Sequence, residues 1–282
     1  MSDIRDRSGA WMAGMIGMQE TTRGVLRFAG ADARAVLQGV VTNNVDLVTP
    51  GRAVYSALLT PQGKYLCDFF LLDGDSGDVL IDVSVAQAPV LAQKLQMYGL
   101  RRDAKVSVEQ GCEIALIWGG ESEMPEGEGI VADPRNPALG WRRYGPDAAG
   151  FLNRARIAEA STRDRDALRI AHLVPESGIE LLPEDTYILE AGFERLSGVD
   201  FSKGCYVGQE VTARMKHKTT LRKGLVRVAV DGHADAGTPI KSDGKPAGTL
   251  FSQADGSGLA HLRLDRAGEG MEAGFATVSY KP

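Results

Sequence analysis

Short β-rich runs and amphipathic helical windows alternate along the first part of this chain, and this order limits the folds open to it. Residues 24–30, 78–85, 104–110 and 112–119 each have the composition of a strand. Residues 49–73 hold two more such runs, joined by "TPQG", whose proline and glycine favour a turn. Strands joined by short turns pair in an antiparallel fashion. We therefore predict an α+β fold with antiparallel sheets.

Three segments have the apolar periodicity of helices, and these are residues 32–45, 86–100 and 161–176. Asp32 and Ser161 are candidate N-caps of the first and third segments, and Gly99 would close the second. After residue 224, short strands alternate with glycine turns for roughly 60 residues, a pattern typical of a small closed or sandwiched β-domain.

Composition and charge argue against several classes of protein. The 282 residues carry a net charge of -5, which is unfavourable for stable nucleic-acid binding. No apolar run approaches the roughly 18 residues that a membrane helix needs, and the N-terminus lacks the pattern of a signal peptide. Cys67, Cys112 and Cys205 are an odd, scattered set beside only four histidines. We expect a cytoplasmic protein with no metal site, no disulfide framework and no membrane contact.

The stretch "KGCYVGQE", residues 203–210, places a cysteine beside a lysine and between two glycines. The residues that follow have helical composition, so Cys205 is expected near a helix N-terminus. A helix N-terminus and the charge of Lys203 both lower the pKa of a thiol and raise its reactivity. Gly204 and Gly208 permit close approaches that a side chain would block. The alternative is that Cys205 is an inert, buried cysteine in a tight turn.

Two neighbouring segments have the chemistry to meet a ligand. Residues 214–223, "RMKHKTTLRK", are strongly basic and could meet an acidic ligand tail, or they form a solvated face. Residues 183–190, "PEDTYILE", offer carboxylates for the N–H groups of a heterocycle, or they are ordinary surface acids. A cysteine hydrolase that pairs Cys205 with His172 or His217 is disfavoured, because no orienting acid stands at a recognisable spacing.

Several segments together resemble a known family. "KGCYVGQE" matches the signature of the YgfZ-type folate-binding proteins, which are relatives of the glycine cleavage T-protein, an aminomethyltransferase. The segments that resemble other parts of that family are, in order, "LQGVVTNNV" (37–45), "SALLTPQGKYLCDFFL" (56–71), "DPRNPALGWR" (133–142), "RIAHLVPESGIELLPEDTYILEAG" (169–192), "KPAGTLFS" (245–252) and "GLAHLR" (258–263). The resemblance covers roughly residues 21–265.

This resemblance implies a three-lobed fold with a channel for folate. We expect residues 1–50 with 133–222 to form a first, discontinuous α+β domain that carries the signature. Residues 51–132 would form a ferredoxin-like α+β domain, and residues 223–282 a C-terminal β-barrel.

The resemblance also implies a function, namely binding of tetrahydrofolate or a one-carbon derivative in the assembly or repair of iron–sulfur enzymes, including tRNA-thiolating ones. The expected partners are folate and iron–sulfur client enzymes or assembly proteins. The functional thiol falls on Cys205, with Lys203 beside it. We expect the folate to be contacted by Glu190, Tyr206, Gln209, Glu210 and Arg214.

The alternative function is a folate-dependent aminomethyl or one-carbon transferase. In the T-protein a catalytic aspartate is expected where this chain has "TNN", residues 42–44. That departure, and the presence of Cys205, argue against aminomethyl transfer.

Overall fold

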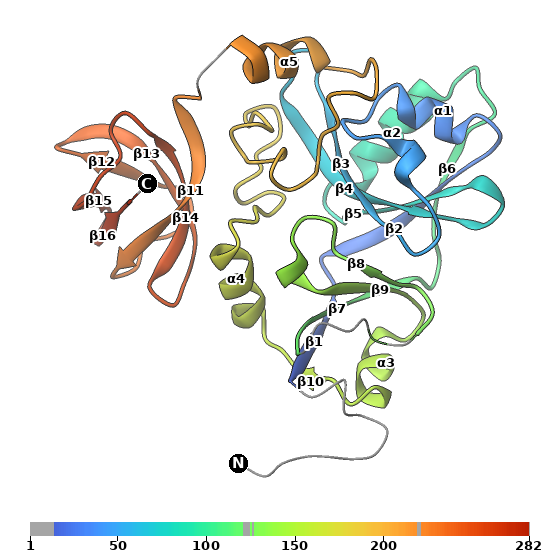
Figure 1. Ribbon diagram of the computed structural model, residues 1–282, viewed down its shortest axis with the longest axis horizontal. Helices are drawn as coiled ribbons and strands as arrows, with labels where there is room; N and C mark the ends of the chain where they lie inside the picture. The colour runs from blue at the N-terminus through green and yellow to red at the C-terminus, as the bar shows by residue number, and fades with distance from the viewer. Residues whose placement is uncertain (1–13, 121–124, 126, 219–220, 282) are drawn as a thin grey trace.

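The structure is a computed structural model that describes residues 14–281, apart from 121–124, 126 and 219–220 (Figure 1). It contains two five-stranded sheets, which pack on each other, and a closed six-stranded barrel. All pairings within the two larger sheets are antiparallel except the short one between β1 and β10. The predicted α+β fold with antiparallel sheets and a C-terminal barrel is confirmed.

The first of these sheets, the β2 sheet, has the strand order β3-β4-β5-β2-β6. Its strands are β2 (Arg23–Ala29), β3 (Val54–Leu59), β4 (Tyr65–Asp73), β5 (Val79–Ser84) and β6 (Lys105–Val108). The predicted hairpin is present, because β3 pairs with β4 across the "TPQG" turn.

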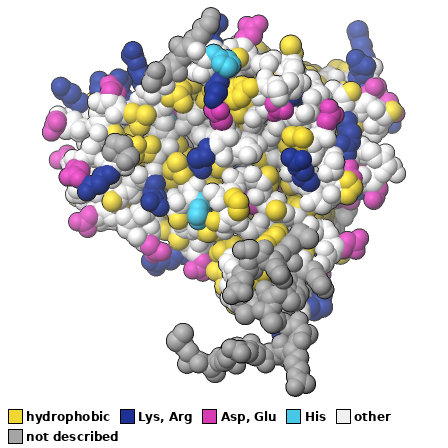
Figure 2. All heavy atoms as spheres, in the orientation of Figure 1, with side chains coloured by type: hydrophobic (Ala, Val, Ile, Leu, Met, Phe, Trp, Pro, Cys, Tyr) yellow, Lys and Arg dark blue, Asp and Glu magenta, His cyan; other side chains and the backbone are white. Residues whose placement is uncertain are grey.

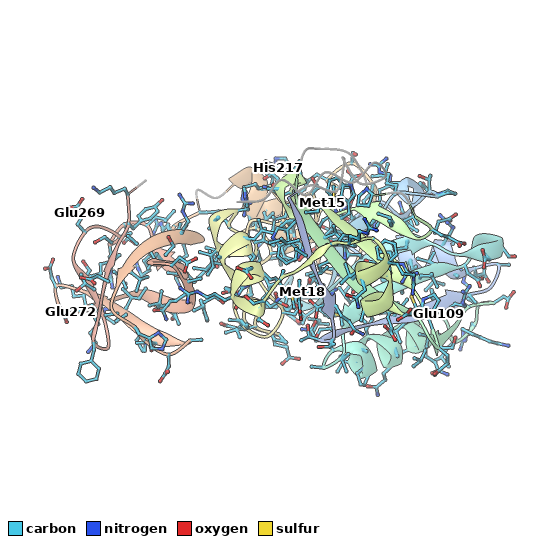
Figure 3. All side chains as sticks on the ribbon, turned by 90° about the horizontal axis from the view of Figure 1, so that it is seen from below. Met15, Met18, Glu109, His217, Glu269 and Glu272 are labelled. Carbon is cyan, nitrogen blue, oxygen red and sulfur yellow. The ribbon has the colours of Figure 1, made fainter. Side chains whose placement is uncertain are left out.

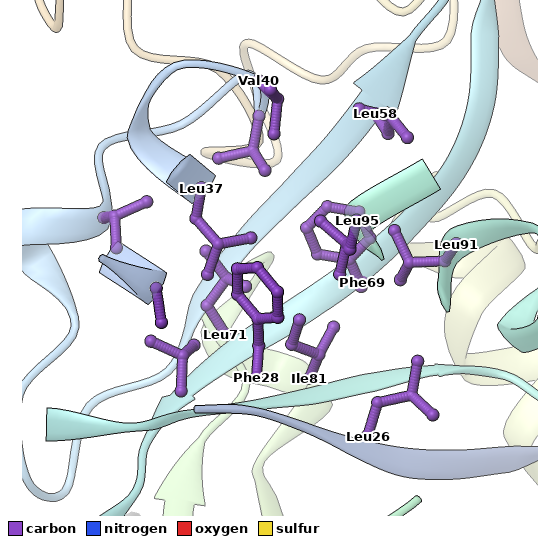
Figure 4. Packing of buried hydrophobic residues seen from close by; sticks show 14 of the residues in the cluster. Leu26, Phe28, Leu37, Val40, Leu58, Phe69, Leu71, Ile81, Leu91 and Leu95 are labelled. Carbon is purple, nitrogen blue, oxygen red and sulfur yellow. The ribbon is translucent and has the colours of Figure 1, made fainter. Parts of the chain in front are cut away.

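One face of the β2 sheet is covered by the helices α1 (Ala33–Gln38) and α2 (Ala88–Tyr98). Figure 4 shows Phe28, Phe69 and Ile81 of the sheet converging on Leu37 of α1 and Leu95 of α2. The other face is covered by the chain between residues 174 and 206. Because both faces are covered, β3 is buried along its whole length.

The second sheet, the β1 sheet, has the order β10-β1-β7-β9-β8. Its strands are β1 (Met15–Glu20), β7 (Glu113–Gly119), β8 (Ile130–Ala132), β9 (Trp141–Gly145) and β10 (Ala158–Glu159). Helix α3 (Ala148–Arg154) packs on one face, and the other face packs on Val25 and Leu72 of the β2 sheet.

The barrel closes in the order β11-β14-β13-β12-β15-β16. Its strands are β11 (Lys223–Asp231), β12 (Thr238–Ser242), β13 (Lys245–Ala254), β14 (Ser257–Arg263), β15 (Met271–Ala273) and β16 (Ala276–Ser279). Helix α4 (Thr162–Ala171) lies between the barrel and the rest of the molecule, and α5 (Gln209–Lys218) leads into the barrel (Figure 1).

The strand pairing crosses both of the boundaries that were expected at residues 50 and 132. Strand β2 comes before residue 50 but pairs with β5 and β6, and β7 comes before residue 132 but pairs with β1 and β9. The segment 141–145 is the strand β9. Local composition does not determine which strands pair, and this is the reason for the difference. The domain division itself stays a prediction.

Two helix predictions were wrong in detail. The helix expected over residues 32–45 ends at Gln38, and Asp32 does not cap it, because its carboxylate accepts the N–H of Asp103 at 2.8 Å. The third helix is capped as predicted by Ser161, within a capping box, but it ends at Ala171. Leu173 then adopts a positive φ of 58°, so the helix ends before it reaches Pro175.

The surface is mixed in charge, and Figure 2 shows basic and acidic side chains interspersed over one face. Among the described helices, none is long and apolar enough to cross a membrane. In the same part of the chain, no group of three or more histidine, cysteine or carboxylate side chains could hold a metal ion.

Candidate functional site

The segment that leads into "KGCYVGQE" is held by the "TNN" segment near the N-terminus. The Thr42 hydroxyl donates to the carbonyl of Gly198 at 2.7 Å, and its own carbonyl accepts the N–H of Asp200 at 3.1 Å. The Asn43 amide donates to the carbonyl of Ser197 at 2.6 Å. The ammonium group of Lys203 donates to the carbonyl of Val41. Two segments that are far apart in sequence are therefore joined by side-chain and backbone hydrogen bonds.

The signature also packs against the "TPQG" turn. Gly208 has a φ of +83°, and a Cβ at this position would lie 2.6 Å from the carbonyl oxygen of Thr60. On the other side of the contact, a Cβ at Gly63 would lie 2.8 Å from the Cβ of Val211. Both positions therefore need glycine. Three segments that resemble the same family thus meet at one place, which we call the signature junction (residues 41–43, 60–63 and 197–211).

Cys205 is exposed at this junction, as predicted. Its neighbour Gly204 has a φ of +96° with open space around it. Cys67 is fully buried and Cys112 is half-buried, and burial raises the pKa of both thiols. The helix α5 begins only at Gln209, so Cys205 precedes the first turn and gains less from the helix dipole than the sequence suggested. The reactivity of Cys205 stays a prediction.

Lys203 is tied into the structure and is not a free cation beside the thiol. Its side chain is half-buried, with the ammonium nitrogen 5.3 Å from the centre of the Tyr206 ring. Burial lowers the pKa of Lys203 to about 8, although Asp200 and Asp46 oppose the shift. The ammonium group that was expected to activate Cys205 therefore stays mostly protonated near neutral pH, but it is directed at the Val41 carbonyl.

Tyr206 is a core side chain, since only 7% of it is exposed and it packs in the cluster beneath the signature. Its buried hydroxyl makes no hydrogen bond of normal geometry among the described residues. Burial raises the pKa of Tyr206, and the neighbouring Thr212 side chain opposes that shift.

A cavity of about 930 Å³ lies between the barrel and the rest of the molecule. Its wall includes Glu190, which lies just before the signature, and the carboxylate of Glu190 is 3.3 Å from the imidazole of His261 in the barrel. Arg222 and Lys223, from the end of the basic stretch, line the same cavity. The lining carries five lysines and arginines against three acids, and this gives it positive character in a chain of net charge -5.

The predicted folate contacts do not gather in one cavity. Glu190 lines the 930 Å³ cavity, whereas Tyr206 is buried and Gln209, Glu210 and Arg214 lie on α5 outside that lining. The sequence reasoning missed the lining side chains Lys64, Tyr187, His261, Arg263 and Arg266. The Lys64 ammonium lies 3.6 Å from the centre of the Tyr187 ring, and both side chains line this cavity. The family resemblance included the segments that contain Lys64, His261 and Arg263, but it assigned no role to these side chains.

A second cavity of about 710 Å³ opens beside the signature junction. It is lined by Asn43, Tyr55, Pro134, Asp200 and Phe201, among others. The lining of neither cavity includes Cys205.

The "DPRNPALGWR" segment builds a buried ion network between the two sheets. Arg142 donates to Asp82 at 2.6 Å and lies 3.5 Å from Asp133, and Arg23 donates to Asp82 at 2.5 Å. Burial alone would raise the pKa of Asp82, but the two guanidinium groups hold it at about 2. Arg135 pairs with Asp133 at 2.7 Å. This segment therefore fixes the sheets against each other and does not contact Cys205.

Comparisons with known proteins agree with this arrangement. Residues 222–282, which include the barrel strands, match the family described as "CAF17, C-terminal beta-barrel domain". The chain is 31% identical over 274 residues to "Iron-sulfur cluster assembly factor IBA57 homolog, mitochondrial" of Mycosarcoma maydis, which covers 89% of this chain and 65% of that protein. It is 29% identical over 294 residues to the human "Iron-sulfur cluster assembly factor IBA57, mitochondrial", which covers 90% and 81%.

The chain is therefore similar to the IBA57/CAF17 proteins over most of its length. This confirms the relationship predicted from the "KGCYVGQE" stretch. The chain spans 65% of the length of the Mycosarcoma maydis relative. The names of both relatives place those proteins in mitochondria, so the cytoplasmic location expected from the sequence stays a prediction for this chain.

A solved structure is also similar to this chain. The glycine cleavage system aminomethyltransferase T from Bartonella henselae superposes with a TM-score of 0.77 over 95% of this chain and 85% of that chain, at 15% identity. At that identity the likeness shows the fold alone, and the predicted T-protein-like architecture is confirmed.

Proposed function

We propose that this chain is an iron–sulfur cluster assembly factor that acts through Cys205 and binds a reduced folate in the 930 Å³ cavity. The observation that carries the proposal is the signature junction, where three distant segments hold an exposed cysteine in an open turn. The names of the IBA57 relatives support the assembly role.

Cys205 would work together with a partner. One thiolate cannot hold an iron–sulfur cluster alone, because such clusters need about four protein ligands. The remaining ligands would come from an iron–sulfur client enzyme or another assembly protein. Clients that thiolate tRNA fall within this proposal, with no stable contact between this chain and nucleic acid.

The assembly role can be tested with purified proteins. The chain is mixed with a cluster-loaded scaffold protein and an apo iron–sulfur enzyme, and recovery of enzyme activity is measured. The wild-type chain should accelerate recovery, Cys205→Ser should abolish the acceleration, and Cys112→Ser should retain it. Equal recovery with wild type and Cys205→Ser would show that the thiol has no part in the transfer.

The chemistry of the 930 Å³ cavity supports binding of tetrahydrofolate or a one-carbon derivative. Glu190 is an acceptor for the N–H groups of a pterin ring, and Tyr187 provides an aromatic wall. Arg222 and Lys223 are free of ion pairs among the described residues and suit the carboxylates of the folate tail. A cavity of this volume is within the usual range of about 300–1,000 Å³ for small-molecule sites.

Calorimetry with tetrahydrofolate tests this assignment. We expect binding by the wild-type chain and at least about tenfold weaker binding by Glu190→Gln, because the neutral amide is a poorer acceptor. Glu272→Gln, on the far end of the barrel (Figure 3), is the matched control and should leave the affinity unchanged. No heat and no thermal shift at millimolar ligand would remove the folate part of the proposal.

A folate-dependent aminomethyl or one-carbon transferase remains the second candidate, favoured by the T-protein-like fold. The "TNN" segment offers no carboxylate for such a reaction, and both atoms of the Asn43 amide are already hydrogen-bonded. Formation of methylenetetrahydrofolate from an aminomethyl donor, retained by Cys205→Ser, would favour this candidate over the first.

A further inference from the structure

Exposed apolar side chains gather around α2, at the side of the molecule away from the barrel (Figure 1). Of the seven large apolar side chains that are exposed among the described residues, five fall between residues 85 and 108. Three of them, Val90, Met97 and Leu100, are 46%, 49% and 76% exposed. Single exposed apolar residues are ordinary, but a group on one element indicates an interaction surface.

The spacing of these side chains places them on the outward face of α2. Leu91 and Leu95 point into the core and are fully buried. Val90 and Met97 are seven residues apart, so they stand one above the other on the opposite side of the helix. Leu100 follows directly after the helix ends at Tyr98. The outward face also carries the exposed amides of Gln93 and Gln96, so Val90 and Met97 are apolar positions within a partly polar face.

The charged residues along α2 and in the two positions after Leu100 are basic, although Arg102 lies 4.0 Å from Asp32 and is followed by the exposed Asp103. Residues 85–102 contain Lys94, Arg101 and Arg102 and no acidic residue, although the whole chain has 37 acids and a net charge of -5. Lys94 is half-buried at the flank of this face, four residues after Val90 and three before Met97. Among the described residues, Lys94 and Arg101 have no ion-pair partner. An apolar stripe with basic neighbours suits a partner that is apolar and acidic.

We propose that the outward face of α2 is the docking surface for an acidic amphipathic helix of a partner protein. A helix laid along α2 would bury Val90, Met97 and Leu100 against its own apolar stripe. Its flanking carboxylates would meet Lys94 and Arg101. A membrane surface is disfavoured, because lipid recognition of this kind uses clusters of about four to eight basic residues. The surface lies beside the β6 edge strand, and Glu109, which follows β6, marks the end of the molecule opposite the barrel in Figure 3.

The test uses a labelled synthetic peptide of about 18 residues, long enough to be helical, with a leucine stripe flanked by glutamates. A peptide of the same composition in scrambled order is the control probe. Fluorescence anisotropy with the full chain should show binding of the amphipathic peptide that weakens as salt is raised, and at least about tenfold weaker binding of the scrambled one. Met97→Glu and Leu100→Glu should each weaken binding at least about tenfold through charge repulsion and lost apolar contact. Phe275→Glu, on the barrel, should leave it unchanged.

Circular dichroism melts check that the three variants remain folded. We expect this because the side chains of Met97, Leu100 and Phe275 are exposed, so their replacement leaves the core unchanged. The proposal is wrong if the scrambled peptide binds as well, or if Met97→Glu and Leu100→Glu bind like the wild type. If the chain binds anionic phospholipid vesicles but not the peptide, the proposal is wrong and the surface is a membrane-binding site. If the chain self-associates in the ultracentrifuge and Met97→Glu abolishes this, the proposal is wrong and the surface binds a second copy of the chain.

Discussion

The tight contact at Gly208 gives a quantitative test of the signature junction. We expect Gly208→Ala to be destabilising for two separate reasons. Its φ of +83° is unfavourable for an L-residue, at about 1–2 kcal/mol, and the new Cβ would lie 2.6 Å from the Thr60 carbonyl oxygen. Relief of that overlap requires the backbone to move, which typically costs about 1–3 kcal/mol more.

Gly204 is the matched control within the same eight residues. Its φ is +96°, but a Cβ there would meet nothing within 4 Å. Gly204→Ala should therefore have the backbone cost alone, and the difference between the two variants isolates the contact between the signature and the "TPQG" turn. We expect Gly208→Ala to be the less stable by about 1–3 kcal/mol.

Urea unfolding followed by circular dichroism measures the stability of each variant. The rate of Cys205 alkylation without urea measures how exposed the thiol is in the folded protein. Equal destabilisation by the two alanines would refute the close contact. If Gly208→Ala lowers the stability but leaves the rate of Cys205 alkylation unchanged, the exposure of the thiol does not depend on the packing of Gly208 against Thr60.

Three further outcomes follow from the buried charges and the surface. The folded pKa of Lys203 is lowered to about 8 from 10.5, so the stability of the wild type relative to Lys203→Met should rise as the pH increases from about 8 to 10.5, as measured by urea midpoints. Asp82→Asn should lower the unfolding free energy by about 3–5 kcal/mol, because Arg23 and Arg142 then lose their shared partner. Because the folded pKa of Asp82 is lowered from 3.8 to about 2, its contribution to stability should be complete above pH 3.8 and lost as the pH falls through 2. Phe275→Ser should change the unfolding free energy by no more than about 0.5 kcal/mol, because that side chain is fully exposed.

Local signals in the sequence predicted the elements well. The Ser161 cap, the end of α2 at Gly99 and the hairpin around "TPQG" depend on residues within a few positions of each other, and all are present. The predicted helix over residues 32–45 was too long, because Gly39 and the β-branched and asparagine residues that follow it are poor helix formers. Where the residues that determine a helix end or a turn lie within a few positions of each other, the sequence alone is sufficient to predict that element.

The site depends on contacts between distant residues, and these were predicted less well. The importance of residues 42–44, 60–63 and 203–210 followed from resemblance, but their meeting at one junction depends on the pairing of strands far apart in the chain. The partner of Glu190 is His261 in the barrel, which no local pattern indicates. Lys203 was expected to activate the thiol, and no local pattern indicated that its ammonium group would be half-buried and donate to the Val41 carbonyl.

The most direct test of the central claim is complementation in a strain that lacks its own protein of this family. The activity of an iron–sulfur client enzyme is measured in cells that express wild type, Cys205→Ala or Cys112→Ala at equal levels. The account predicts that Cys205→Ala fails to restore client activity while the purified variant melts like the wild type, and that Cys112→Ala restores it. Full restoration by Cys205→Ala would contradict a functional thiol, and loss of folding in that variant would show that Cys205 is only structural.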